Sequence, residues 1–94
     1  MEYDQTAVDR VASIERSILK LHHPHQAEFV GIINAIELQV EYGKPVLTVV
    51  QHLADALLEL ARQRGVRRSH ISELETKLER LQKFLHTGVP TEHP

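Results

Sequence analysis

The sequence contains no cysteine and no long apolar run. Without cysteine the chain has no disulfide, no thiol nucleophile and no cysteine-ligated zinc, which agrees with a cytoplasmic setting. No apolar run approaches the roughly 20 residues that span a bilayer, and the start, Met1-Glu2-Tyr3-Asp4, is acidic where a secretory signal would be basic. We therefore predict a cytoplasmic protein that does not insert into membranes.

An excess of charge of one sign is missing as well. The 11 Lys and Arg residues oppose 13 Asp and Glu residues, which gives a formal net charge of -2. The chain as a whole therefore offers no electrostatic attraction to nucleic acid or acidic membranes, and any basic surface must be local. Its 94 residues allow one small domain that buries a modest fraction of its surface, so we predict a homodimer.

Apolar residues at helical spacing dominate the sequence. In four stretches they recur at steps of three and four residues, which places them on one face of a helix. The helices are expected near Asp4–Leu21, Pro24–Tyr42, Pro45–Arg64 and Ser69–His86. Short connections between such helices predict an all-α four-helix bundle, with a single domain over residues 1–88 and a short flexible tail over 89–94.

Two details of this prediction depend on local chemistry. The run Val46–Val50 is rich in β-branched residues, so a short strand there is the main structural alternative, although the apolar pattern continues in helical phase to Ala61. Glycine and serine positions mark the helix ends. We expect left-handed caps at Gly43 and Gly65, a helix N-cap at Ser69, and a helix end at Gly88 and Pro90.

The fourth stretch has the most regular apolar pattern. It follows a strict heptad, which is typical of helices that pack along their length. The seam consists of Ile71, Leu74, Leu78, Leu81 and Leu85. This seam can pack against the third helix of the same chain or against the fourth helix of a second copy, and the sequence leaves both arrangements open.

Three histidines, His22, His23 and His25, surround Pro24 between the first two stretches. Imidazole is a common metal ligand, but adjacent side chains at a helix boundary diverge and no carboxylate pattern completes a ligand shell. We therefore predict a solvated turn, with no metal and no cofactor.

An arginine-rich corner joins the third and fourth stretches. Arg62, Arg64, Arg67 and Arg68 lie close together around Gly65 and form a local positive patch on an acidic chain. In one interpretation they solvate the turn of an antiparallel helical hairpin, because basic residues suit the C-terminal end of a helix.

In a second interpretation the corner binds DNA. The segment Leu57–Thr76 resembles the bacterial helix-turn-helix signature in its small, turn and buried positions. The positions that carry the likeness are Ala61, Gly65, Val66, Ser69, Ile71 and Leu74. The resemblance implies that the second helix reads the major groove, with arginines on phosphate or guanine. The residues implied on that face are Arg67, Arg68, Ser69, Ser72, Glu73 and Thr76.

Catalytic signals are scarce. The chain has no glycine-rich phosphate loop and no Cys/His or Ser/His/Asp pattern, and its aromatic content of 4% gives little material for a pocket. We expect a protein that is not an enzyme. The leading hypothesis is a helical protein–protein interaction module, a small adaptor or regulator that offers helix faces and the arginine corner to a partner. The alternative is a small DNA-binding transcriptional regulator that uses the same corner.

Overall fold

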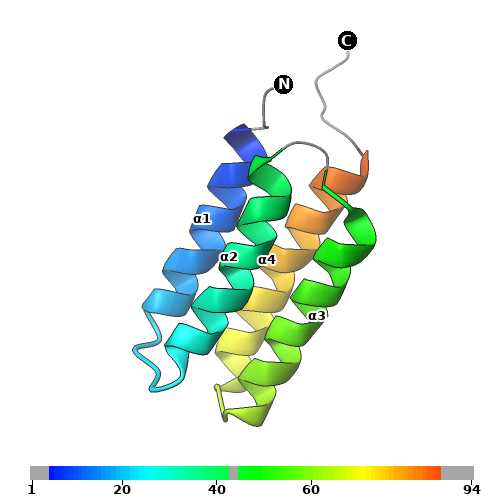
Figure 1. The fold of residues 1–94 in the computed structure, drawn as a ribbon. Coiled ribbons are helices and arrows are strands. Elements are labelled where there is room, and N and C mark those ends of the chain that lie inside the picture. Colours follow the sequence, from blue (N-terminus) through cyan, green and yellow to red (C-terminus); the bar gives the residue numbers. More distant parts are fainter. Residues whose placement is uncertain (1–4, 43–44, 88–94) are drawn as a thin grey trace.

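The computed structural model describes residues 5–42 and 45–87, and within these ranges the chain is all-helical. It contains α1 (Gln5–Leu19), α2 (Gln26–Glu41), α3 (Leu47–Gln63) and α4 (Arg68–Thr87). Successive helices run in opposite directions, and the turns that follow α1 and α3 lie at the same end of the molecule (Figure 1). The predicted all-α helical bundle is confirmed.

The four helices close into a ring around one apolar core. Each contacts two neighbours, because α1 packs on α2, α2 on α3, α3 on α4, and α4 on α1. The predicted seams point inward. The fully buried large side chains include Phe29, Ile14, Ile18, Ile33, Ile36, Leu57, Leu74, Leu78 and Leu81. Removing such side chains from water is the main driving force for folding, at about 1.5–3 kcal/mol each.

The helix boundaries differ from the predicted ones by one or two residues, within the usual variation. Helix α1 ends at Leu19 rather than at Leu21, because His22 adopts a left-handed backbone with φ 49. Pro24 lies in the turn before α2 instead of its first turn, where the amide of Gln26 bonds the carbonyl of His23 at 3.0 Å.

Helix α3 ends at Gln63 and begins at Leu47 rather than at Pro45. Val46 is extended, and its amide donates a hydrogen bond of 3.1 Å to the side-chain oxygen of Gln39 on α2. The residues from Leu47 to Val50 are helical, so the strand alternative is wrong. The tertiary contacts of α3 override the β preference of its first turn.

At the corner after α3, the prediction for Gly65 is confirmed and the prediction for Ser69 is wrong. Gly65 has φ 79, the left-handed conformation expected of a glycine cap. The amide of Gly65 bonds the carbonyl of Arg62 at 3.1 Å, and the amide of Val66 bonds the carbonyl of Ala61 at 3.0 Å, which together form a Schellman motif. Ser69, however, is not the N-cap. Helix α4 begins one residue earlier, at Arg68, so Ser69 lies inside its first turn. The caps predicted at Gly43 and Gly88, and the tail over 89–94, lie outside the described residues.

Candidate functional site

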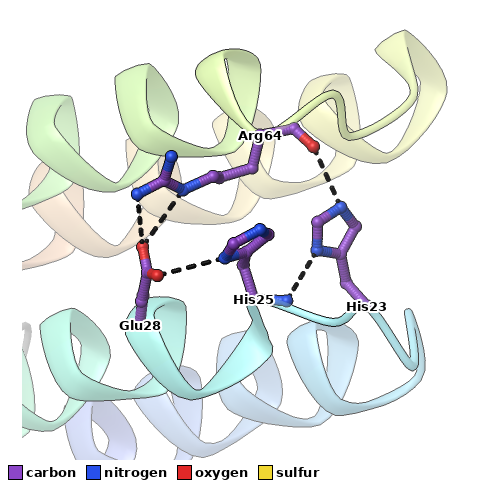
Figure 2. A network of polar contacts seen from close by, with 4 residues as sticks. All are labelled: His23, His25, Glu28 and Arg64. Atoms are coloured by element: carbon purple, nitrogen blue, oxygen red, sulfur yellow. Dashed lines mark hydrogen bonds and ion pairs between the residues drawn. The ribbon is translucent and has the colours of Figure 1, made fainter.

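The arginine corner and the histidine turn meet at one end of the bundle. They are far apart in the sequence, but the alternating helix directions bring both connections to the same end (Figure 1). Figure 2 shows four residues that join them: His23, His25, Glu28 and Arg64. No local sequence pattern indicates this contact, because it depends on how the helices are arranged.

His23 makes hydrogen bonds through both of its ring nitrogens, one within its own turn and one to the arginine corner. The amide of His25 donates to Nδ1 of His23 at 3.0 Å, so this nitrogen is the unprotonated one. The other nitrogen, Nε2, therefore carries the hydrogen and donates to the carbonyl oxygen of Arg64 at 3.1 Å. The ring also lies 5.4 Å, centroid to centroid, from the buried ring of Phe29. In the predicted solvated turn His22 is exposed, and the side chain of His25 is 43% exposed, whereas His23 also packs on Phe29.

Glu28 holds the other side of the same contact. Its Oε1 accepts hydrogen bonds from Nε and Nη2 of Arg64 at 3.2 and 3.1 Å, and its Oε2 accepts one from Nδ1 of His25 at 3.1 Å. The bonds from His25 and Arg64 favour the charged carboxylate and hold the pKa of Glu28 below its ordinary value of 4.5. These side chains are largely exposed, so the network orients the turns more than it stabilises the fold.

The four arginines of the corner have different surroundings. Arg64 is paired with Glu28, and Arg62 lies 3.6 Å from Glu59 and 3.8 Å from Glu75. Arg67 and Arg68 are exposed, and within the described residues no salt bridge to either one is found. The predicted positive patch is therefore reduced to two adjacent arginines at the start of α4.

These two arginines border open hollows at this end of the molecule. Arg68 lines one with Arg62, Ser72 and Glu75, and Arg67 lines another with His23 and His70. The basic surface of the hollow beside Arg68 is interrupted by the carboxylate of Glu75. The arrangement leaves room for an anionic group, but the positive charge is not concentrated in one place.

The other residues of the helix-turn-helix likeness lie along the side of α4. Ser69, Ser72 and Thr76 are exposed, whereas Glu73 accepts a hydrogen bond from Oγ of Ser17 at 3.0 Å and lies 3.7 Å from Nζ of Lys77. Helices α3 and α4 lie side by side in opposite directions (Figure 1). A groove-reading pair usually crosses at about 90–120°, so this geometry favours the antiparallel hairpin interpretation.

The heptad seam of α4 faces the interior of the same chain. Ile71, Leu74, Leu78 and Leu81 are buried in the core, and Leu85 is half-buried against it. Their partners are α1 and α3. The seam is therefore occupied within the bundle, and any contact with a second copy must use another surface.

Such a surface exists on α2, and the sequence analysis did not identify it. On the side of α2 that faces away from the core of the bundle, one strip of residues carries no charge and is mostly exposed. It consists of Ala27, Gly31, Asn34, Ala35, Leu38 and Tyr42, which we call the outer strip of α2. Leu38 is 55% and Tyr42 77% exposed. An outer face that lacks charge and exposes large apolar side chains, on a helix whose inner face is also apolar, is typical of a helix that is covered on both faces.

Further exposed apolar side chains flank the C-terminal end of this strip. Val46, Leu47 and Val49 at the start of α3 are 52%, 39% and 38% exposed. The bond from the Val46 amide to Gln39 holds this start of α3 against α2. Leu47 lines a hollow with Gln82 and His86 of α4. Of the three exposed apolar residues, Val46 is thus the one that a hydrogen bond places beside the C-terminal part of α2.

Other kinds of site have little support. Among the described residues, no three histidine or acidic side chains are placed to hold a metal ion. None of the helices, over the part of the chain that the structure describes, is long and apolar enough to cross a membrane. Comparison with known proteins found no matching family model, no matching curated protein and no matching solved structure.

Proposed function

We propose that the chain is a non-enzymatic protein–protein interaction module, a small self-associating adaptor or regulator that binds through the outer strip of α2. The observation that carries this proposal is the exposure of Leu38 and Tyr42 on a strip without charge. A monomer in water gains nothing from large apolar side chains placed there, whereas a contiguous exposed apolar surface is characteristic of interaction sites. Tyrosine is also enriched at the centres of protein interfaces.

The charges around this strip favour a protein partner over nucleic acid. The charged residues of α2 are Glu28, Glu37 and Glu41, and the helix contains no lysine or arginine. Phosphate would be repelled by this side of the molecule. A protein that presents an apolar face of its own matches the strip.

The proposal is tested by partner capture with a matched control. The immobilised chain is compared with a Leu38→Glu/Tyr42→Glu variant and with Thr76→Glu, which places a charge on the exposed side of α4. Because all three positions are exposed, the variants should fold as the natural chain does. We expect proteins recovered from cell extract to be lost with the α2 variant and kept with Thr76→Glu. Equal recovery with all three chains would contradict the proposal.

DNA binding is a second candidate, and the exposed pair Arg67 and Arg68 at the N-terminus of α4 favours it. Binding to random duplex DNA, measured by fluorescence anisotropy at low and physiological salt, tests it. Steeply salt-dependent binding that Arg67→Ala/Arg68→Ala weakens would support the regulator, because counterion release produces that slope. Absence of binding at low salt would leave the interaction module alone.

A further inference from the structure

The shape of the outer strip of α2 suggests which partner it takes. Small residues, Ala27, Gly31 and Ala35, occupy its N-terminal half, and the large Leu38 and Tyr42 occupy its C-terminal half. The spacing of three and four residues keeps them in one line along the helix. Apart from Asn34, the strip thus has small side chains in one half and two large side chains in the other, and we refer to the positions of Ala27, Gly31 and Ala35 as its groove.

Gly31 is the least expected member of this line. A glycine inside a helix costs about 0.5–1 kcal/mol relative to alanine. The chain itself gives no reason for it, because an added Cβ would meet nothing within 4 Å and the backbone φ is not positive. The fold of the single chain does not require a glycine here. A glycine is useful, however, where another molecule approaches the helix backbone closely.

We infer that the molecule that approaches Gly31 is a second copy of the chain, with the two α2 helices packed antiparallel. In that arrangement Ala27 lies opposite the second copy's Tyr42, Gly31 opposite its Leu38, and Asn34 opposite its Ala35. Each large side chain therefore meets a groove position, and the same residues serve both copies, as a two-fold interface requires. A parallel pairing would place Leu38 on Leu38 and Gly31 on Gly31, which leaves a gap at one end and crowding at the other.

The charged residues of α2 border the strip and do not lie on it. The antiparallel arrangement brings Glu41 to the level of the second copy's Glu28, whose carboxylate is already paired with Arg64 and His25 of its own chain. Within the strip no charged residue opposes another. One helix from each copy makes a small interface, so the dimer should depend on protein concentration. This inference rests on the proposed function and specifies the partner of the same surface.

Cysteine cross-linking tests the arrangement, because the natural chain has no cysteine and a single introduced thiol reports only on contact between copies. Ala35→Cys lies near the two-fold axis and should form a disulfide with itself readily. In Tyr42→Cys the two thiols would be about 22 Å apart, at about 1.5 Å of helix rise per residue, so it should not. Mixing Ala27→Cys with Tyr42→Cys should give the mixed dimer, and Thr76→Cys on α4 is the control. Self-linking of Tyr42→Cys as fast as that of Ala35→Cys would overturn the antiparallel pairing.

A second variant separates a shaped groove from general stickiness. Gly31→Leu adds apolar surface and helix propensity at a position where an added Cβ has no other atom within 4 Å. We expect it to raise the dimer dissociation constant about tenfold or more in sedimentation velocity, because it fills the groove. Thr76→Leu, its counterpart on α4, should leave the constant unchanged. Tighter association of Gly31→Leu would overturn the inference.

Different results would overturn the second-copy partner and the proposed function. A natural chain that sediments as a monomer at every concentration overturns the second-copy partner, yet the capture experiment can still show that another protein binds the strip. Loss of the capture effect with a dimer present would leave self-association as the role of the strip.

Discussion

Helices α2 and α4 have similar inner faces and opposite outer ones. Both bury four large apolar side chains or more in the same core. The outer strip of α2 carries no charge, although Glu28 and Glu41 border it, whereas the corresponding residues of α4 are all hydroxyl-bearing or charged. These residues of α4 are Ser69, Ser72, Thr76, Glu79, Arg80 and Lys83, the outer strip of α4. The residues on the inner face of a helix indicate how it packs in the fold. The residues on its outer face indicate whether that face contacts water or a partner.

Both helices make polar contacts with their neighbours. Helix α4 is joined to α1 by polar side chains, since Nζ of Lys77 donates to Oγ of Ser13 at 3.1 Å and to Oγ of Ser17 at 2.7 Å. Arg10 of α1 also lies over the ring of Phe84, 5.1 Å from its centroid. Helix α2 has polar contacts with the two ends of α3 at Gln39 and Glu28. The difference between the two helices therefore lies in their outer strips.

The largest expected effect is on stability, and we expect it to be similar for the inner faces of α2 and α4. Ile33→Ala on α2 and Leu78→Ala on α4 each remove a buried side chain, and each should lower the free energy of unfolding by about 2–5 kcal/mol. Urea denaturation followed by circular dichroism measures both. A loss below 1 kcal/mol in either variant would mean that its helix does not contribute to the core as described.

The next effect concerns the corner before α4. Gly65→Ala forces a side chain into the left-handed conformation at φ 79, which should destabilise the chain by about 1–2 kcal/mol. The same denaturation measurement checks this value. Gly65→Asn is the control and should lose less, because asparagine tolerates this conformation better. Equal losses would show that the left-handed backbone is not the cause.

The same substitution of glycine by alanine on α2 should change the free energy of unfolding in the opposite direction. Gly31→Ala should raise the free energy of unfolding by about 0.5–1 kcal/mol, because the helix gains propensity and the new methyl group meets no other atom. The measurement requires a protein concentration at which the natural chain is monomeric. A destabilised monomer would reveal a requirement for glycine within the fold and would weaken the argument for an external partner.

The smallest effect is electrostatic and depends on pH. The folded-state pKa of Glu28 is lowered by His25 and Arg64, so its contribution to stability is present above the ordinary value of 4.5 and is lost as pH falls through the lowered pKa. Glu28→Gln should therefore melt at a slightly lower temperature than the natural chain at neutral pH, and the difference should vanish in acid. Melting curves of both chains across this pH range test the prediction. A difference that persists at the lowest pH would mean that the ion pair is not its source.

Much of the fold could be predicted from the sequence, because burial imposes a helical period that local residues reveal. The seams of all four helices and the left-handed cap at Gly65 are examples. Features that depend on the arrangement of distant segments could not be predicted. The bond between His23 and the carbonyl of Arg64 needs two turns at one end of the bundle, and the pairing of Arg62 with Glu75 needs α3 beside α4.

The outer strip of α2 was missed for a different reason. The apolar period of a helix identifies its inward face and gives no information about the opposite one, where Gly31 and Leu38 lie. Only when the core is assigned to Phe29, Ile33, Ile36 and Val40 does the opposite side of the helix stand out as uncharged. The absence of charge on an exposed face is the signal that the sequence offered.

The most direct test of the difference between the two outer strips is a dilution series followed by amide chemical shifts in NMR. The account predicts that shifts of residues 27–42 in α2 move with protein concentration, while those of the outer strip of α4 stay constant. Shifts that move along α4 and stay constant along α2, or that do not move at all, would contradict it.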